Sequence, residues 1–373
     1  MMNGFKKYLY ALVGIFMSSF SFGQNKIAMN GLEDTPSVKT NIHNKLIYNQ
    51  VKYFPNNTEL SIAIIDSGMV QYLGIKRLDD TIRFAINSQD VFEIGSLSKV
   101  FTATLLANIS LENILNLDDN IQDYLGFDIK TSDTITFKTL ANHTSGLPRL
   151  PSNLNMFMAD RNNPYSAYNS KDLIEYLTNK VELKSKPGNK YDYSNLGAGI
   201  LGYALAEIKK STYEDLLHEK IFSKYHMTNS TTQKDKIKNH LVKGLNPSGE
   251  VTPNWDFDVL AGGGAILSNI EDLTAFGLAH FETTNEELLI TQIPTFVVNE
   301  KMSLGLGWHI LKGPKGGDIL WHNGGTGGYS SSMALDIAKK NGIIILSNVS
   351  AFHKNKGNLD QLCFELIKWL EEK

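Results

Sequence analysis

Segments with the pattern of β-strands lie near both ends of this chain, and a long stretch with helical periodicity separates them. Leu60 to Ile64 and Met69 to Ile75 flank the turn residues Asp66-Ser67-Gly68, an arrangement that predicts a β-hairpin. Because strands need partners, the two terminal groups predict one antiparallel sheet assembled from both chain ends, flanked by helices, in an α/β (α+β) fold. Further strand-like segments occupy Ser303–Leu311, Gly328–Asp336 and Gly342–Ser347.

The organisation follows from this pattern. The sheet region is expected at about residues 45–90 and 300–373, and a mostly helical region at about 91–299. The clearest helical segments are Val100–Leu115, Leu173–Val181, Gly199–Lys209 and Tyr213–Phe222.

The amino terminus has the three-part layout of a secretory signal. Lys6 and Lys7 precede an apolar run from Tyr8 to Met17, and Ser21-Phe22-Gly23 follows as a small-residue cleavage site. The apolar run is too short to span a bilayer. We therefore expect residues 1–23 to be removed, and residues 24–373 to be periplasmic or secreted with no stable membrane span.

Charge and cysteine content exclude several classes. The net charge of −3 and the scattered lysines provide no basic surface, so nucleic acid is not expected as a partner. The only cysteine, Cys363, lies in a predicted amphipathic helix over Leu359–Leu370, where it is expected to be a buried small hydrophobe. A single cysteine cannot form an intrachain disulfide.

Ile94-Gly95-Ser96-Leu97-Ser98-Lys99 is the first candidate site, at the start of a predicted helix. Residues three apart lie on one helix face, so the Ser96 hydroxyl and the Lys99 amine can meet. The backbone N–H groups of a helix start favour negative charge that develops on a bound carbonyl. Taken alone, the pattern also fits an N-capping serine followed by a solvated lysine.

The second candidate is Tyr193-Ser194-Asn195, which follows Pro187-Gly188 and precedes a helix rich in small residues. Its phenol can transfer a proton, and its amide can hold both an amine and a substrate amide. Taken alone, the triplet also fits a buried tyrosine beside an Asx turn.

The third candidate runs from Trp321 to Tyr329 and enters a strand. Its glycines allow a substrate backbone to approach the strand edge, and the N–H group of Gly325 can donate to an oxyanion. Taken alone, the segment also fits a flexible hairpin approach.

In this order and in these contexts, the three motifs resemble the serine β-lactamase and low-molecular-mass penicillin-binding-protein family, especially its class C β-lactamase branch with peptidase and esterase relatives. The resemblance runs from about Asn49 to the carboxyl terminus. It also includes Phe92-Glu93, Leu117-Asp118-Asp119, Asn142-His143-Thr144-Ser145-Gly146-Leu147-Pro148, Ala261-Gly262-Gly263-Gly264 and Leu346-Ser347-Asn348.

The resemblance implies a β-lactamase/transpeptidase-like fold and a set of roles. Ser96 would be acylated, and Lys99 and Tyr193 would share the general-base and general-acid work. Asn195 would orient the lysine and the substrate. The N–H groups of Ser96 and Gly325 would form the oxyanion hole.

The third motif departs from the class C pattern. Class C enzymes usually show Lys-Thr-Gly, whereas this chain has His322-Asn323-Gly324. The resemblance places Gly324 at the substrate and gives His322 the role of steadying either Tyr193 or the substrate carboxylate. It places Asn348 near that carboxylate. Because histidine is largely neutral at pH 7 unless a neighbour raises its pKa, the departure weakens the expectation of tight carboxylate binding.

Other signals are weaker. Gly197–Gly202 matches the dinucleotide-binding Gly-x-Gly-x-x-Gly pattern but lacks a preceding apolar strand, so its glycines are expected to allow close helix packing. His218-Glu219 lacks the second histidine of a zinc protease, and His143 is interpreted as structural. No metal and no cofactor are predicted.

The sequence thus predicts an exported active-site serine hydrolase that works through an acyl-enzyme, with β-lactam hydrolysis favoured. Cleavage of D-alanyl-D-alanine peptides, as a carboxypeptidase or endopeptidase, and cleavage of esters stay open because of His322. A non-catalytic penicillin-binding sensor is a further alternative. The expected partner is a small β-lactam or a cell-wall peptide.

Overall fold

The computed structural model describes residues 27–32, 41–154, 160, 162–313 and 315–373. The predicted signal segment, residues 1–23, lies outside the described residues. The strands are β1 (Met29–Asn30), β2 (Glu59–Asp66), β3 (Met69–Leu78), β4 (Thr81–Ala85), β5 (Phe92–Glu93), β6 (Leu267–Ser268), β7 (Phe296–Asn299), β8 (Met302–Leu304), β9 (His309–Lys312), β10 (Asp318–Gly325), β11 (Ser330–Asp336) and β12 (Asn341–Ser347).

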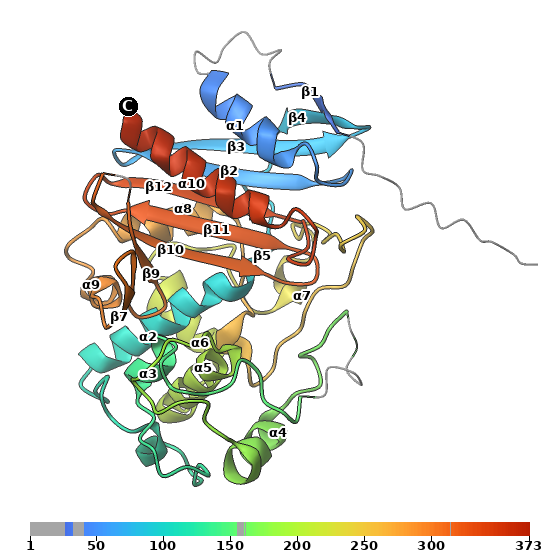
Figure 1. The fold of residues 1–373 in the computed structure, drawn as a ribbon. Coiled ribbons are helices and arrows are strands. Elements are labelled where there is room, and N and C mark those ends of the chain that lie inside the picture. Colours follow the sequence, from blue (N-terminus) through green and yellow to red (C-terminus); the bar gives the residue numbers. More distant parts are fainter. Residues whose placement is uncertain (1–26, 33–40, 155–159, 161, 314) are drawn as a thin grey trace, which may run out of the picture.

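A large sheet joins the two ends of the chain, in the order β1-β4-β3-β2-β12-β11-β10-β9-β8-β7 (Figure 1). At its centre β2 pairs antiparallel with β12, with Leu60 opposite Ser347 and Ile65 opposite Gly342. Only the short edge pair of β1 and β4 is parallel among the described strands. The predicted fold class is confirmed, and β5 with β6 forms a separate small ladder.

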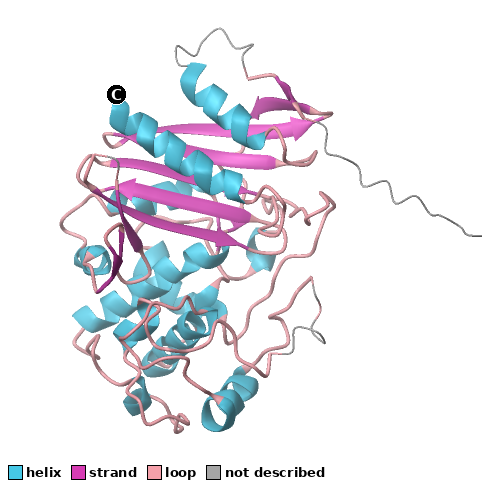
Figure 2. Cartoon of the chain, viewed as in Figure 1, coloured by secondary structure: helices cyan, strands magenta, loops and turns pink. Residues whose placement is uncertain are grey.

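The helices divide into two groups, one on each face of the sheet (Figure 2). They are α1 (Asn41–Val51), α2 (Ser98–Leu111), α3 (Phe137–Ala141), α4 (Ser170–Glu175), α5 (Asn195–Lys209), α6 (Tyr213–Leu217), α7 (Lys234–Ile237), α8 (Ile270–Ala279), α9 (Glu286–Gln292) and α10 (Gly357–Glu372). Short helical turns are η1 (Gly95–Leu97), η2 (Ile121–Tyr124), η3 (Tyr176–Lys180), η4 (His218–Phe222) and η5 (Ala261–Gly263).

Side chains of the central strands alternate between two cores, because successive residues of a strand point to opposite faces. On β12, Ile343 and Ile345 pack with α1 and α10. Ile344 and Leu346 pack on the opposite face, in the larger core that contains α2, α5 and α8. The candidate motifs all lie at the edge of this larger core.

The predicted hairpin is present. Ser67 and Gly68 both have positive φ, +52° and +82°, and they connect β2 to β3 directly between the paired residues Asp66 and Met69. A two-residue turn of this kind matches the right-handed twist of the strands. The carboxyl-terminal helix is also present as α10, with Cys363 fully buried in it.

Three local expectations differ from the structure. The segment Ser303–Leu311 is not one strand: β8 and β9 are separated by a turn in which the Gly305 N–H donates to Trp308 O and Gly307 has a φ of +74°. Residues 45–51 were expected in the sheet region but lie in the helix α1. The third motif ends β10 rather than simply leading into the next strand.

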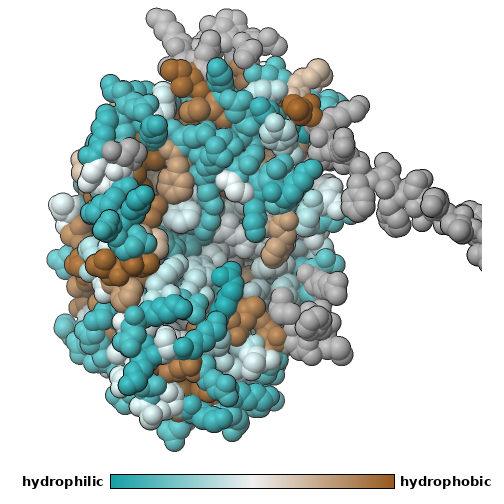
Figure 3. Space-filling view, in the orientation of Figure 1, coloured by the Kyte–Doolittle hydropathy of each residue, from teal (hydrophilic) through white to brown (hydrophobic). Residues whose placement is uncertain are grey.

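The surface drawn in Figure 3 carries hydrophobic residues in separate patches between hydrophilic ones. None of the helices in the described ranges combines the length and the apolar composition needed to cross a membrane.

Candidate active site

The Ser96 hydroxyl is presented by a sharp change from strand to helix. The chain leaves β5, turns at Gly95 with a φ of +52°, and enters η1 and then α2. A positive φ favours glycine at this position. The Ser98 hydroxyl accepts the Ile266 N–H at 3.1 Å, which ties the first residue of α2 to the segment before β6.

Lys99 is nearly fully buried, at 2% exposure, and directly contacts the serine. Its Nζ lies 3.1 Å from Ser96 Oγ and donates to Gly263 O at 2.6 Å. Burial, with a smaller contribution from the charge of Arg149, holds the pKa of Lys99 well below its usual range. A neutral amine beside a hydroxyl can accept its proton, which is the condition for activating Ser96.

Tyr193 precedes α5, whose first turn is capped by Ser194: the Gly197 N–H donates to its hydroxyl at 2.8 Å. The Tyr193 ring lies 5.0 Å from Lys99 Nζ. Burial raises the pKa of Tyr193, while a hydrogen bond with Ser96 and the charge of Arg149 oppose that rise. The phenol therefore keeps its proton near neutral pH and is suited to donate it.

The glycines of the third motif allow β10 to pass very close to the segment that carries Ser96. A Cβ at position 324 would lie 1.9 Å from Ile94 O, and a Cβ at position 95 would lie 2.5 Å from Gly325 N. The Thr326 N–H donates to Tyr329 O. Since N–H groups alternate in direction along an antiparallel strand, the preceding N–H group, that of Gly325, is expected to point away from β11, and its nitrogen lies beside Gly95. The structure thus brings Gly325 to the side of Ser96.

Two histidines pack beside Tyr193. The ring of His143 lies 4.3 Å from the Tyr193 ring, and its Nδ1 accepts the Ser194 N–H at 3.2 Å. The ring of His322 lies 6.2 Å from that of Tyr193 and is fully buried. His322 Nδ1 lies 2.6 Å from Asn323 O, which can only accept, so Nδ1 carries the hydrogen. Burial holds the pKa of His322 well below its usual range.

The two predicted asparagines have different surroundings. Asn195 lines the pocket and donates to the Tyr165 hydroxyl at 3.4 Å, and its buried Oδ1 has no hydrogen-bond partner among the described residues. No hydrogen bond between Asn195 and Lys99 is present among the described residues, so its role as the orienter of the lysine stays a prediction. Among the described residues, Asn348 does not line the pocket, and the hydrogen bonds of its side chain are to backbone groups.

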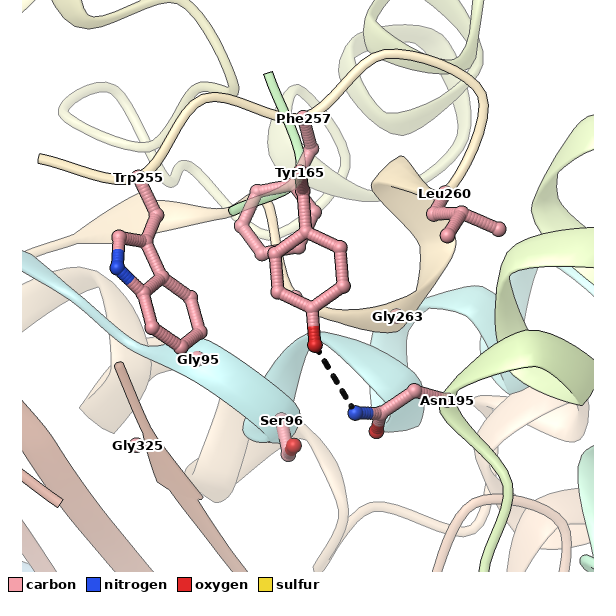
Figure 4. Close-up of a pocket in the computed structure, with 10 residues that line it drawn as sticks. Gly95, Ser96, Tyr165, Asn195, Trp255, Phe257, Leu260, Gly263 and Gly325 are labelled. Carbon is pink, nitrogen blue, oxygen red and sulfur yellow. Dashed lines mark hydrogen bonds between the residues drawn. The ribbon is translucent and has the colours of Figure 1, made fainter. Parts of the chain in front are cut away.

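An aromatic wall faces Ser96 across the pocket (Figure 4). Tyr165 stacks on Phe257, with ring centroids 4.7 Å apart, and Trp255 meets Tyr165 edge-on at 5.3 Å. The space enclosed between the wall and Ser96 is about 20 Å³, a little more than one water molecule needs, so the pocket is narrow at this point. The pocket is lined by Gly95, Ser96, Tyr165, Asn195, Trp255, Phe257, Leu260, Gly263, Gly264 and Gly325.

Glu93 of β5 binds the segment that carries Trp255 of this wall. Its Oε1 accepts the Trp255 N–H at 2.9 Å and the Asn254 side chain at 2.8 Å. Burial raises the pKa of Glu93 to about 7.

The sequence did not identify Tyr165, Trp255, Phe257 or Arg149 as site residues. Their isolated positions form no local motif, and only the fold brings them together. The Gly263 carbonyl belongs to a loop quoted in the resemblance, which was the one available signal.

The glycines of Gly197–Gly202 pack as expected. A Cβ at position 199 would lie 2.5 Å from Leu260 Cδ2, and one at position 202 would lie 2.9 Å from Gly262 Cα. Close packing of α5 on η5 therefore explains these two glycines. Within the described part of the chain no group of three or more potential ligands is placed to hold a metal ion.

Sequence comparison decides the family. A model of the family "Beta-lactamase" matches residues 57–362. The chain belongs to the β-lactamase family. Members of this family of serine β-lactamases and penicillin-binding proteins are serine hydrolases that act on β-lactams or cell-wall peptides.

Two curated relatives of this β-lactamase-family chain cover different shares of it. "Penicillin-binding protein 4*" of Bacillus subtilis (strain 168) is 26% identical over 287 residues, 70% of this chain and 62% of the relative. The chain therefore spans less than two thirds of the length of that protein. "D-alanyl-D-alanine-carboxypeptidase/endopeptidase AmpH" of Escherichia coli (strain K12) is 25% identical over 345 residues, 84% of this chain and 86% of the relative.

Solved structures of the same family share the fold. A penicillin-binding protein homologue from Pyrococcus abyssi, described as octameric, has a TM-score of 0.76 and 21% identity, and covers 90% of this chain and 78% of its own. A "Beta-Lactamase/D-Alanine Carboxypeptidase" from Pseudomonas syringae has a TM-score of 0.72 and 21% identity, and covers 87% and 98%.

Proposed function

We propose that the chain is an acyl-enzyme hydrolase with Ser96 as its nucleophile, and that it hydrolyses the amide bond of β-lactams. The observation that carries the proposal is the contact of Ser96 with Lys99, whose pKa is lowered, beside the protonated phenol of Tyr193. The proposed base, nucleophile and acid thus lie beside one another, and the directions of the two pKa shifts favour the protonation states that acylation needs.

Acylation transfers two protons. Ser96 Oγ attacks the carbonyl carbon and gives its proton to the neutral Lys99 amine. The N–H groups of Ser96 and Gly325 stabilise the oxyanion. When the C–N bond breaks, the Tyr193 phenol protonates the leaving nitrogen, and the proton held by Lys99 then returns to the phenolate.

Deacylation uses the same amine. A water molecule attacks the ester carbonyl while Lys99 takes a proton from it. As the ester bond breaks, Lys99 returns this proton to the Ser96 oxygen. The net reaction adds one water to the substrate and restores the resting enzyme.

Cleavage of D-alanyl peptides is the second candidate. The E. coli relative, which matches 84% of this chain, is named a carboxypeptidase/endopeptidase. His322 in place of the usual lysine keeps this activity and an esterase activity open.

The test measures steady-state hydrolysis of nitrocefin, a D-Ala-D-Ala peptide and a p-nitrophenyl ester by the purified protein. Labelling of Ser96 by a fluorescent penicillin and its loss in Ser96→Ala are expected. Labelling that persists in Ser96→Ala contradicts the assignment. A stable adduct in intact mass spectrometry without turnover of any substrate identifies a penicillin-binding sensor instead.

We further propose that the protein is exported, by cleavage after Gly23, to the periplasm or the medium. The proposal rests on the charged, apolar and small-residue segments at residues 1–23. Mass spectrometry of the amino terminus in the non-cytoplasmic fractions tests it: Gln24 is the expected first residue, and an intact Met1 in those fractions contradicts it.

A further inference from the structure

The third motif brings no positive charge to the site. Because His322 Nδ1 donates to Asn323 O, the remaining nitrogen of the neutral ring, Nε2, offers a lone pair. This nitrogen is buried and has no hydrogen-bond partner within the described ranges. A lone pair repels a carboxylate, so His322 cannot replace the lysine that the motif usually carries.

Lys99 does not supply a resting charge either. Its amine lies against Ser96 and Gly263, and burial lowers its pKa. A substrate anion therefore finds no cation on α2 or on β10.

Arg149, which lies on neither α2 nor β10, supplies a positive charge beside Tyr193. Its guanidinium carbon lies 5.1 Å from the centre of the Tyr193 ring, and its positive charge acts on Lys99, Tyr193 and Tyr165. The Arg149 carbonyl accepts the N–H groups of Asn195 and Leu196 at 3.0 and 3.1 Å, which fixes its backbone to the start of α5.

The Arg149 side chain is free to bind. It is exposed, and no hydrogen bond or ion pair to its guanidinium is found among the residues that the structure describes. Arg77 shows the contrasting case: it is buried, with bonds from its guanidinium to Asn56, Phe54 and Asp80. The guanidinium of Arg77 is used in hydrogen bonds that stabilise the fold, whereas the guanidinium of Arg149 lies beside the Tyr193 ring.

We propose that Arg149 determines specificity by binding a carboxylate of the substrate while Ser96 attacks the carbonyl. The inference rests on the proposed function and narrows its substrate class to acyl donors that carry an anionic group close to the scissile bond. A guanidinium offers parallel N–H groups that match the two oxygens of a carboxylate.

The test uses two thioesters that differ in one group: N-benzoyl-D-alanyl-thioglycolic acid and its carboxamide. The acid carries a carboxylate and the amide does not. Wild-type protein, Arg149→Ala, Arg149→Lys and the control Arg83→Ala, an exposed arginine on β4, are compared by kcat/KM. Each is measured on its own pH plateau, since loss of the Arg149 charge also raises the pKa of Lys99.

In Arg149→Ala the acid-to-amide ratio of kcat/KM is expected to fall about 10- to 100-fold, mainly through KM for the acid. Arg149→Lys should recover part of the ratio, and Arg83→Ala should leave it unchanged. Equal losses on both thioesters would overturn the proposal and assign Arg149 to the support of Lys99. If wild-type protein hydrolyses neither thioester and Ser96 is not acylated, the proposed function itself fails.

Discussion

Asn348 and Asn195 are both predicted site residues, but the hydrogen bonding of their side-chain amides differs. At the end of β12, Asn348 donates to Asn57 O at 3.1 Å and to Lys243 O at 2.9 Å, and it accepts the Glu59 N–H at 2.7 Å. In the pocket, Asn195 makes one long hydrogen bond, and its buried Oδ1 has no partner in the described part of the chain.

The difference separates a structural polar group from one available to a ligand. Buried polar groups are normally paired, because an unpaired one costs free energy. At the strand end the protein satisfies this rule with its own backbone. In the pocket it leaves Asn195 Oδ1 without a partner among the described residues, so a substrate donor can bind there. The resemblance alone did not distinguish the two residues.

The largest expected effect tests whether the pocket region serves chemistry. Ser96→Ala removes the nucleophile, so kcat/KM should fall about 10⁴-fold or more, with the unfolding free energy nearly unchanged. Substrate hydrolysis and denaturant unfolding measure the two quantities. Ser110→Ala, on the same helix α2, is the control, and comparable loss in both variants would contradict the assignment.

The variant Lys99→Arg tests whether the buried amine must be neutral to act as the base. Arginine keeps its proton at all accessible pH values, so it cannot act as a base, and a loss of about 10³-fold is expected. In wild-type protein, activity should rise as pH increases through the lowered pKa of Lys99, because the amine loses its proton there. The pH profile of kcat/KM measures this limb. Lys209→Arg, on α5, is the control; a fully active Lys99→Arg would show that the amine is not the base.

Alanine substitutions at the two asparagines compare the regions directly. Asn348→Ala should lower the unfolding free energy by about 3 kcal/mol, since three hydrogen bonds are lost, and leave kcat of the folded protein intact. Asn195→Ala should change stability by less than about 1 kcal/mol and lower kcat/KM about 10-fold. Chemical unfolding and kinetics on both variants provide the measurements. The reverse pattern would show that Asn195 is the structural residue.

Glu93, which binds the segment that carries Trp255, allows the pH dependence of stability to be compared as well. Its folded pKa of about 7 exceeds that of an unfolded glutamate, 4.5, so the folded state binds its proton more tightly. The resulting stability is fully present below pH 4.5 and is lost as pH rises through 7. Glu93→Gln should remove up to about 2–3 kcal/mol of this decline, measured by unfolding at pH 5 and pH 8. An unchanged pH dependence in the variant would exclude Glu93 as its source.

Local patterns predicted much of the fold. The hairpin of β2 and β3 and the strand β12 follow from alternation and turn residues, and the shared sheet follows from the need of both strand groups for partners. The split between β8 and β9 could not be predicted, because Gly305 and Gly307 interrupt one continuous apolar pattern only through their close contacts in the folded chain.

For the site, spacing was informative only within a single element. Ser96 and Lys99 are three apart on one helical segment, so their contact could be expected from geometry. The approach of Gly325 and the aromatic wall depend on contacts between distant segments, which no local pattern encodes. The same limit explains why Arg149 was not identified: its guanidinium meets Tyr193 only in the folded protein.

The pairing of residues 60–65 with residues 342–347 determines when this protein can form during its synthesis. The middle of the sheet stays open until residues 342–347 are available, so β2 has no partner on that side before then. Folding of such long-range pairings is slow and leaves apolar edges exposed in the meantime. A chain that ends before β12 would therefore contain Ser96 but would lack the strand that joins the two halves of its sheet.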